Sequence, residues 1–510
     1  MGSSQQPHAD GVVQRRLTAV LSASGESSLA SPKFAVYLDQ QDTVSRSDQF
    51  HFPSVATVRP PGEAAALRPN RSSAAPSERD SESSVYLAGN SLGLMPNSTP
   101  KLIQEELEAW KSQGVLGHVE HPYERPWVKI DEIVTPTLAE IVGAKPSEVA
   151  CMGSLTSNIH ILFTTFYRPT SDRHKILYEG KAFPSDQYAF ASQAEMRGLA
   201  SSSLLPMDPR PHEYTLRTED ILQMIEEQGD SIAIICFGAV QYYSGQWFDM
   251  ETITKAGHAK GCLVAFDCAH AVGNVPIRLH DWGVDFAAWC SYKYLNAGPG
   301  GIAGLYVHER WADKKRLAGW WGHDSSTRFA MPNVFAPNPG AAGWQLSNPS
   351  VLDVISLYSS LQVFKSVGSS GSSSTGGGRA PEGEAKSAPF MAILRHRSLL
   401  LTGYLEALLK QSPHYVGIER LGSTDLKQIK FTLITPADPE ERGAQLSLLF
   451  DPPEAMDAIF DGLRSVGVLG DERRPGVIRL APVPLYNSFR DAHKAATCLD
   501  EVIGQHLASL

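Results

Sequence analysis

The sequence has no apolar run long enough to span a membrane, and it carries no excess of positive charge. A membrane-spanning helix needs about 20 consecutive apolar residues, whereas the longest apolar runs here, such as 232–240, suit buried strands. The 510 residues hold 45 Lys and Arg against 55 Asp and Glu, a net charge of −10. This balance argues against a nucleic-acid surface and favours small-molecule partners. We therefore expect a soluble protein with no membrane and no nucleic-acid partner.

Cysteine is also scarce, with six residues and no C-x-x-C pair. The spacing favours neither a metal site nor a redox pair, so we expect no metal. Most of the cysteines lie in or beside apolar runs, which indicates buried free thiols in a reducing compartment. The N-terminus shows no secretory signal, and we expect a cytoplasmic location.

The length allows two domains, and composition suggests where they are divided. We expect four parts: a mobile N-terminal segment (1–84) with a helix near 33–50 and a Pro/Ser-rich loop, a large domain (85–365), a Ser/Gly-rich flexible insert (366–388) and a small domain (389–510).

Strand-length and helix-length patterns alternate through the large domain. The expected strands are 149–152, 175–177, 232–237, 262–266, 286–290 and 302–307. The expected helices are 99–113, 129–142, 157–166, 184–198, 218–228 and 250–260. Such alternation is typical of an α/β fold with a mostly parallel central sheet covered on both faces. The small domain shows a shorter α/β pattern, with helices near 394–411 and 453–466 and strands near 428–433 and 477–480. Ligands of such sheets bind beyond the carboxyl ends of the strands, so the residues just after each apolar run matter most.

A single lysine, Lys293, stands in the polar turn that ends the apolar run 284–290. An amine held away from water at such a point can attack an aldehyde carbon and form a Schiff base. Taken alone, a lysine that simply faces solvent at a strand end is the commoner explanation.

Asp267 follows the apolar run 262–266 and precedes Lys293 by one strand–helix–strand unit. A carboxylate at this position could hold a protonated ring nitrogen, because it favours the charged form of its partner. A helix-capping aspartate explains the position about equally well.

Two further strand ends carry polar or aromatic groups. Residues 153–158 open a helix with Ser154 and Thr156, and free N–H groups and hydroxyls there suit a phosphate. Plain capping by either side chain is the alternative. Phe183 follows the next run and offers a ring face for stacking, although it could equally be a core residue.

A phosphate site, a stacking ring, an aspartate and a lysine at successive strand ends together suit one cofactor, pyridoxal 5′-phosphate. The rival pattern is Gly298-x-Gly300-x-x-Ala303, which matches a dinucleotide fingerprint. It leads into an expected strand rather than a helix, which disfavours that interpretation.

Seven motifs resemble those of the kynureninase family. They occupy residues 86–94, 182–186, 266–274, 279–282, 289–296, 319–323 and 481–487. The resemblance runs from about residue 30 to the C-terminus, apart from the insert. It implies the aspartate-aminotransferase-like (fold type I) fold and a homodimer. It also implies pyridoxal-phosphate-dependent hydrolysis of L-kynurenine and 3-hydroxy-L-kynurenine to anthranilate or 3-hydroxyanthranilate plus L-alanine, in tryptophan catabolism and NAD biosynthesis.

The resemblance also implies roles for single residues. Lys293 holds the cofactor and then moves protons, and Asp267 holds the pyridine nitrogen. The other cofactor-binding positions are Leu155, Thr156, Phe183, Pro184, Ser185, Asp186, His270, Tyr292, Trp320 and Asn348. Of these, Trp320 and Asn348 match positions that reach the site from a partner subunit.

The resemblance also assigns the substrate positions to Ser91, His118, Asn348 and Arg479. An arginine suits the substrate's α-carboxylate because its donors match that group pairwise. Tyr243 or His118 could steady the oxyanion that develops at the side-chain carbonyl.

Two positions depart from the family pattern. Gly238 stands where some members have a serine, and Gln241 stands where others have a histidine. The alternatives are another fold type I enzyme, such as a cysteine desulfurase or an aminotransferase, and a binding protein that kept the fold. A desulfurase needs a cysteine on a mobile loop near the site, and none is well placed.

Overall fold

The computed structural model describes residues 10–60, 81–369, 389–422 and 428–509. The chain forms two compact units. The first comprises Met1–Met95, Tyr243–Gln246 and Ile393–Leu510, and the second comprises Pro96–Tyr242 and Trp247–Ala392. Most of the expected Pro/Ser-rich loop (61–80) and of the insert (370–388) lies outside the described residues.

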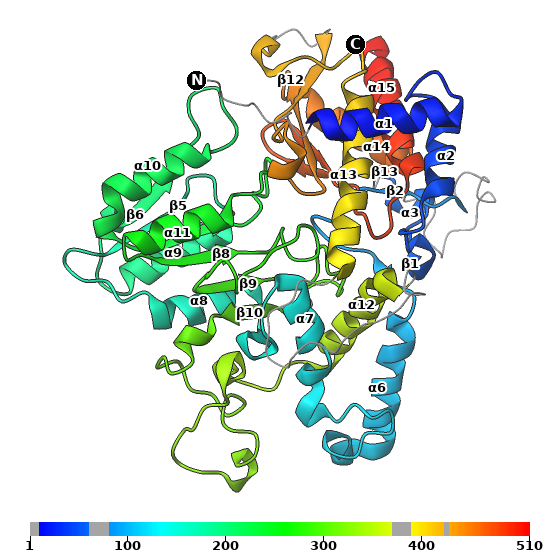
Figure 1. Ribbon diagram of the computed structural model, residues 1–510. Coiled ribbons are helices and arrows are strands. Elements are labelled where there is room, and N and C mark those ends of the chain that lie inside the picture. Colours follow the sequence, from blue (N-terminus) through cyan, green and yellow to red (C-terminus); the bar gives the residue numbers. More distant parts are fainter. Residues whose placement is uncertain (1–9, 61–80, 370–388, 423–427, 510) are drawn as a thin grey trace. The chain divides into compact units, whose positions relative to one another are not determined.

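The second unit is built on a seven-stranded sheet (Figure 1). In spatial order the strands are β4 (Val149–Cys151), β10 (Gly304–Val307), β9 (Phe286–Trp289), β8 (Leu263–Asp267), β7 (Ile232–Gly238), β5 (Lys175–Glu179) and β6 (Leu204–Met207). Only β10 runs antiparallel to its neighbours; the other pairings among the described strands are parallel. The prediction of a mostly parallel α/β sheet is confirmed, and β6 is a strand that the apolar pattern did not indicate.

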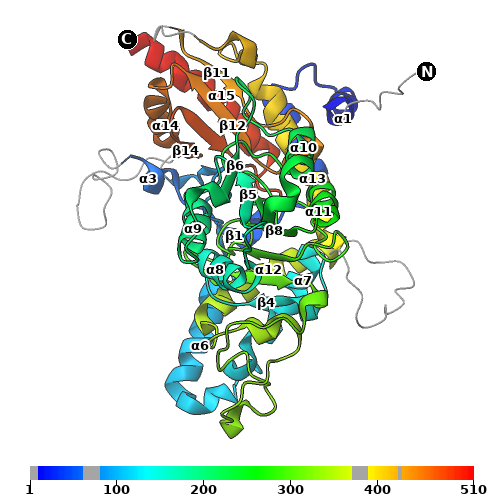
Figure 2. The ribbon, with the colours of Figure 1, turned by 90° about the vertical axis from the view of Figure 1, so that its left-hand side faces the viewer.

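Helices cover both faces of this sheet, as Figure 2 shows. On one side lie α8 (Leu155–Phe166) and α9 (Pro184–Glu195), and on the other lie α10 (Thr218–Gln228) and α11 (Met250–Ala259). Aromatic rings join α8 to the strands: Phe166 stacks on Phe286 with ring centroids 4.6 Å apart. On the opposite face Gly257 lets α11 approach closely, since a Cβ there would lie 2.5 Å from Val264.

Three further helices of the second unit are α6 (Thr99–Gln113), α7 (Thr135–Val142) and α12 (Val351–Ser369). The predicted helix 99–113 is confirmed, and Gly114 ends it with φ 56°. The predicted helix 129–142 is wrong in its first half. A 3₁₀ helix, η4 (Trp127–Ile133), precedes α7, and Pro136 in the first turn of α7 explains the break. Proline is tolerated at a helix start but disrupts a helix interior.

The first unit has a four-stranded antiparallel sheet. Its order is β11 (Lys430–Leu433), β12 (Leu446–Asp451), β15 (Val477–Leu480) and β14 (Asp471–Arg473). The helices are α1 (Asp10–Ser24), α2 (Pro32–Gln41), α3 (Val55–Val58), α14 (Ala455–Ser465), α15 (Phe489–Ser509) and most of α13 (Pro389–Leu409). The short strands are β1 (Phe50–His51), β2 (Val85–Tyr86), β3 (Met95–Pro96) and β13 (Val468–Leu469).

The N-terminal segment is more ordered than the sequence suggested. Residues expected to be mobile form α1, because Leu17 is buried in the core of this unit with Val13 and Val20 packed beside it. The helix expected near 33–50 ends at Gln41. Within the described ranges, no helix combines the length and apolarity needed to cross a membrane.

Candidate active site

A cavity opens in the second unit where the carboxyl ends of the parallel strands meet. Its lining comes from the residues that follow or end β4, β5, β7, β8 and β9. These residues are Ser154, Leu155, Thr156, Glu179, Phe183, Ser185, Asp186, Gly238, Val240, Tyr242, Asp267, Ala269, His270, Tyr292 and Lys293. The cavity thus gathers the four features that the sequence placed at separate strand ends.

Lys293 lies between two aromatic rings. Its Nζ is 5.8 Å from the ring centroid of Phe183 and 5.8 Å from that of Tyr292. Backbone bonds hold the turn around it: the N–H of Asn296 donates to the carbonyl of Lys293 at 3.0 Å. The side chain therefore points into the cavity rather than to bulk solvent, which excludes the simpler explanation for this lysine.

Asp267 ends β8, and its Oδ1 accepts the N–H of Ala269 at 2.8 Å. Burial raises the pKa of this carboxyl, and the positive charge of Lys293 opposes that rise. Burial, together with the negative charge of Asp267, raises the pKa of Asp186 well above its usual value. A neutral Asp186 beside an ionised Asp267 is therefore the stable charge arrangement of this pair.

One oxygen of Asp186 is a direct indication of a missing group. Its Oδ1 is buried and has no hydrogen-bond partner among the described residues. Buried polar atoms are nearly always hydrogen-bonded, so an orphan atom in a cavity wall calls for a ligand. A ring nitrogen that carries a proton would supply a donor to the Asp186–Asp267 pair.

The start of α8 forms another wall of the cavity. Ser154 and Ser157 hydrogen-bond each other at 2.9 Å and cap the helix. The hydroxyl of Thr156 instead donates to Ser185 at 3.2 Å, and both of these side chains line the cavity. The capping alternative therefore accounts for Ser154 but not for Thr156. Hydroxyls beside a helix N-terminus suit a phosphate.

These groups fit pyridoxal phosphate. The cofactor needs an amine for its aldehyde, a carboxylate for its ring nitrogen, donors for its phosphate and a ring face to stack on. Lys293, Asp267, Thr156 and Phe183 supply these in one cavity. The dinucleotide alternative fails, since the glycine pattern 298–303 leads into strand β10.

Sequence reasoning missed several lining side chains, of which Glu179 and Tyr242 are the largest polar ones. Glu179 ends β5, where the expected strand was too short to include it, and its Oε2 accepts the N–H of Gly238 at 2.9 Å. Burial raises the pKa of Glu179 to about 8. Tyr242 packs edge-on against Phe183, with centroids 5.3 Å apart. The rule of reading the residues after each apolar run would have found Glu179.

Other predicted residues lie outside the lining of this cavity. Pro184 begins α9 beside it. His118, Trp320 and Asn348 belong to the second unit and are exposed, with Trp320 at 48%. Ser91, Tyr243 and Arg479 belong to the first unit. Arg479 is fully buried there, with Nη2 2.7 Å from a carboxylate oxygen of Asp471.

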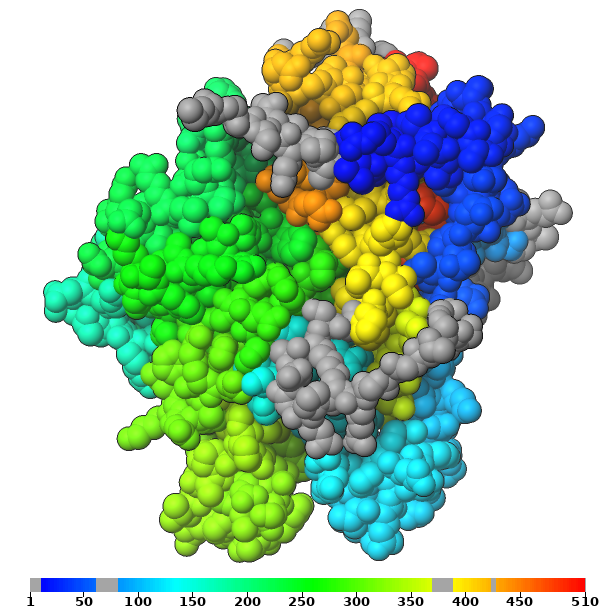
Figure 3. Space-filling view, in the orientation of Figure 1, coloured from blue at the N-terminus to red at the C-terminus, as the bar shows by residue number. Residues whose placement is uncertain are grey.

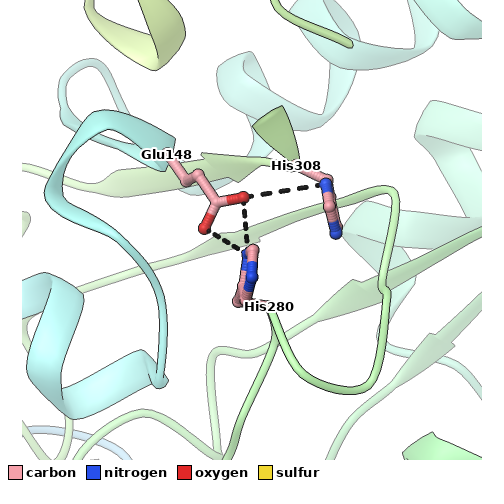
Figure 4. A group of neighbouring side chains, drawn as sticks. All are labelled: Glu148, His280 and His308. Carbon is pink, nitrogen blue, oxygen red and sulfur yellow. Dashed lines mark hydrogen bonds and ion pairs between the residues drawn. The ribbon is translucent and has the colours of Figure 1, made fainter. Parts of the chain in front are cut away.

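A second polar cluster lies at the opposite edge of the same sheet (Figure 4). Glu148 precedes β4 and His308 follows β10, and His280 faces both Glu148 oxygens at 2.9 and 3.0 Å. The residue types could hold a metal ion. However, the N–H of Glu309 and the N–H of Lys145 already donate to the Glu148 carboxylate at 2.8 and 3.0 Å. The geometry is that of a satisfied hydrogen-bond network.

Two family models match the chain. The kynureninase C-terminal domain matches residues 394–499, and aminotransferase class-V matches residues 85–325. Together they cover segments of both compact units, including the whole cavity.

Curated relatives match over most of their length. The kynureninase of Mus musculus is 48% identical over 83% of this chain and 85% of its own. That of Yarrowia lipolytica is 47% identical over 83% and 95%, and that of Homo sapiens is 43% identical over 92% and 93%.

Solved structures support the fold. A mutant of the enzyme C-DES, with glycine covalently linked to its PLP cofactor, superimposes with a TM-score of 0.64. It is 15% identical and covers 82% of this chain and 96% of its own. A cysteine desulfurase from Escherichia coli gives a TM-score of 0.62 at 16% identity, over 84% and 95%. These likenesses show a shared fold, whereas the sequence identities above show the family. The chain belongs to the kynureninase family.

Proposed function

We propose that this chain is a pyridoxal-phosphate-dependent hydrolase that cleaves the Cβ–Cγ bond of L-kynurenine and 3-hydroxy-L-kynurenine. The products are anthranilate or 3-hydroxyanthranilate and L-alanine, which places the enzyme in tryptophan catabolism and de novo NAD biosynthesis. The observation that carries the proposal is the cavity itself. It brings Lys293, the Asp186–Asp267 pair and the start of α8 together, in a chain 43–48% identical to kynureninases.

Each wall of the cavity has a separate task in holding the cofactor. Lys293 would hold the aldehyde carbon and Asp267 the ring nitrogen, with Asp186 as its neutral partner. Leu155, Thr156 and Tyr292 would bind the phosphate, with Ser185 beside Thr156, and Phe183 would stack on the ring. His270 and Tyr292 also line the cavity and complete the binding set. When bound, pyridoxal phosphate supplies an electron sink for bonds broken next to the substrate's amino group.

The proton transfers fall to Lys293. With its Nζ free, Lys293 would remove the α-proton of the substrate and would later deliver a proton to the product. The rings of Phe183 and Tyr292 flank this nitrogen and limit its access to water. An ionised Asp267 would favour the protonated form of the cofactor's ring nitrogen.

The remaining roles concern the substrate. We assign the α-carboxylate to Arg479 and further contacts to Ser91, His118 and Asn348. A donor must steady the oxyanion that forms when water adds to the side-chain carbonyl, and Tyr243 or His118 would serve. One such donor is worth roughly 3–4 kcal/mol of barrier.

We further propose a homodimer in which Trp320 and Asn348 serve the partner's site. Exposed apolar side chains in two segments support this. The first segment contains Trp110, Val115 and Val119, and the second contains Trp320 and Val334. These parts of the chain are coloured cyan and yellow-green in Figure 3. Large apolar groups at the surface often mark an interface. A cytoplasmic location is supported by the burial of all six cysteines.

The direct test is to incubate the purified chain with L-kynurenine and to measure alanine and fluorescent anthranilate. We expect both products in equal amounts, and none from a Lys293→Ala variant, which should also lose the visible absorbance of bound cofactor. Activity that persists in this variant would refute the assignment.

The alternative is a cysteine desulfurase, because the solved structures with the same fold include enzymes of that class. The burial of all six cysteines counts against it, since a desulfurase needs one that can reach the substrate. Incubation with L-cysteine should therefore yield no sulfide under reducing conditions.

A further inference from the structure

The cavity contains a third carboxyl group that the proposed reaction does not use. Glu179 is 4% exposed and lines the same walls as Asp186, Asp267 and Lys293. It stands at the last position of β5, so the strand itself fixes where the side chain begins. A buried carboxyl among other carboxyls is costly unless it has a task or a partner.

The partner of Glu179 is the end of the neighbouring strand. Its Oε2 accepts the N–H of Gly238, the last residue of β7, at 2.9 Å. Gly238 is in turn the register partner of Asp267 on β8, and the N–H of Ala239 donates to the Asp267 carbonyl at 2.7 Å. Two hydrogen bonds, joined by the covalent backbone of Gly238 and Ala239, therefore connect Glu179 to the backbone of Asp267.

Gly238 leaves room for the Glu179 carboxyl, which a side chain at this position would force to shift. A Cβ at that position would lie 2.9 Å from Glu179 Oε1, closer than such atoms approach in proteins. The space that a serine would occupy is filled here by the Glu179 carboxyl. The glycine at position 238, where some family members have a serine, and the position of the Glu179 carboxyl are thus structurally linked.

The charges around Glu179 favour its neutral form. Asp186 faces it from α9, Asp267 from β8 and Cys236 from β7, and Lys293 is the only lysine or arginine among the described residues that line the cavity. One cation cannot balance three carboxylates in a buried space. Burial and the negative charge of Asp267 raise the pKa of Glu179 to about 8, so it holds its proton at neutral pH.

We propose that Glu179 is a positioning residue of the cofactor site: as a neutral acid it fixes the end of β7 and, through it, the direction in which Asp267 faces the cofactor's ring. The proposal rests on the pyridoxal phosphate site proposed above and adds a residue to it. What the position requires is a hydrogen-bond acceptor of this length without a charge.

The test compares three substitutions at this position in the full chain. Glu179→Gln keeps the length and the acceptor but cannot ionise. Glu179→Asp can ionise but is one methylene too short to reach Gly238, and Glu179→Leu removes the acceptor. Glu148→Gln, a buried glutamate at the opposite edge of the sheet, is the matched control. Each protein is stripped of cofactor and titrated with pyridoxal phosphate, and the loaded protein is then titrated with pH while its visible absorption is recorded.

We expect Glu179→Gln and Glu148→Gln to bind pyridoxal phosphate within about threefold of the wild type. Glu179→Asp and Glu179→Leu should bind about tenfold more weakly, the effect of one lost hydrogen bond. The pH at the midpoint of the absorption titration should shift in Glu179→Asp but not in Glu179→Gln. A purely structural role for Glu179 would not produce this difference between the two variants.

Two results would overturn the proposal. Wild-type affinity and titration in Glu179→Asp would show that the bond to Gly238 is not needed. Equal damage in Glu179→Gln and Glu179→Asp would show that the charged form is the working one. If Glu179→Leu does not fold, the Gln and Asp variants still decide. A wild-type chain that binds no pyridoxal phosphate would instead refute the cofactor site itself, so the two failures are distinguishable.

Discussion

Buried carboxyls at the two edges of the central sheet have pKa values that are shifted in opposite directions. At the cavity edge Glu179, Asp186 and Asp267 all have raised pKa values. At the other edge Asp285 is at least as buried, at 1% exposure, yet its pKa is lowered. Burial works to raise it, but the ring of His258 and the N–H of Val264 outweigh that effect. The number of donors, and not the depth of burial, decides the sign of the shift.

The two edges differ in how many hydrogen-bond donors reach their buried carboxylates. Asp285 binds the ring nitrogen of His258 at 2.9 Å, the N–H of Val264 at 2.7 Å, and Arg310 and Trp311 at 2.8 Å each. Glu148 is similarly satisfied by its neighbours (Figure 4). The cavity edge instead leaves Asp186 Oδ1 without a partner among the described residues. The two carboxylates at the other edge are satisfied by protein donors, whereas Asp186 Oδ1 at the cavity edge has no such donor among the described residues.

The largest expected contrast concerns activity. Asp267→Ala should lower kcat at least about a thousandfold, because the ring nitrogen loses the carboxylate that keeps it protonated. The pKa of that nitrogen should then fall by several units, and each unit is worth about 1.4 kcal/mol. Anthranilate fluorescence measures this loss, and thermal unfolding checks that the variant folds. A variant that kept more than a tenth of the wild-type kcat would refute the proposed role of Asp267.

The next effect is on stability, at the other edge. Asp285→Ala should destabilise the chain by about 3–5 kcal/mol, since it leaves the donors of Arg310 and His258 without their buried acceptor. Urea denaturation at neutral pH measures the change. The fraction that remains folded should keep wild-type affinity for pyridoxal phosphate. Lost affinity with unchanged stability would reverse the roles of the two edges.

The pH dependence of stability separates the edges further. The folded-state pKa of Glu179 is raised, so its contribution is fully present below about pH 4.5 and is lost as pH rises toward 8. The folded-state pKa of Asp285 is lowered, so its contribution is present above its unfolded pKa and is lost in acid. Between pH 6 and 8 the Glu179→Gln chain should gain up to about 2 kcal/mol relative to the wild type. Unfolding free energies that stay parallel across this range would show that Glu179 is already ionised.

The smallest effect tests the cluster in Figure 4. His280→Asn should cost about 1 kcal/mol, the usual net contribution of one hydrogen bond, because other donors still satisfy Glu148. Zinc ions added to the wild type should not raise the unfolding temperature, because the Glu148 carboxylate is already satisfied. Stabilisation by zinc that disappears in His280→Asn would identify a metal site instead.

The fold was predictable where local signals agree with the tertiary structure. α10 and β15 match the predicted ranges, and α6 is bounded by the proline and glycine that the sequence shows. α1 was missed because it is stabilised by packing against the core of the first unit, and this packing is not visible in the local sequence. β10 was predicted as a strand, but its antiparallel direction depends on the connection that precedes it.

The site was predictable at strand ends and not beyond them. Lys293 and Asp267 follow apolar runs directly, and the topology then brings them together. Glu179 follows the predicted strand by two residues, so the same rule reaches it, although the sequence analysis did not single it out. The roles of Trp320 and Arg479 cannot follow from the pattern of this sheet, since Trp320 is exposed and Arg479 belongs to the other unit. Their assignment depends on the family.

Because β10 runs antiparallel to β9, the loop between them is held at both ends, and this should favour the return of the Lys293 amine after each turnover. Because no helix intervenes, the loop that carries Lys293 is anchored at both ends by paired residues, Trp289 and Gly304. The N–H of Ala303 also donates to the carbonyl of Gly153, which ties this loop to the start of α8 at 3.0 Å. In the proposed reaction, the Lys293 amine that the substrate displaces could move only by the length of its own side chain. Its return is then an intramolecular step, favoured by an effective concentration that no free amine in solution could reach.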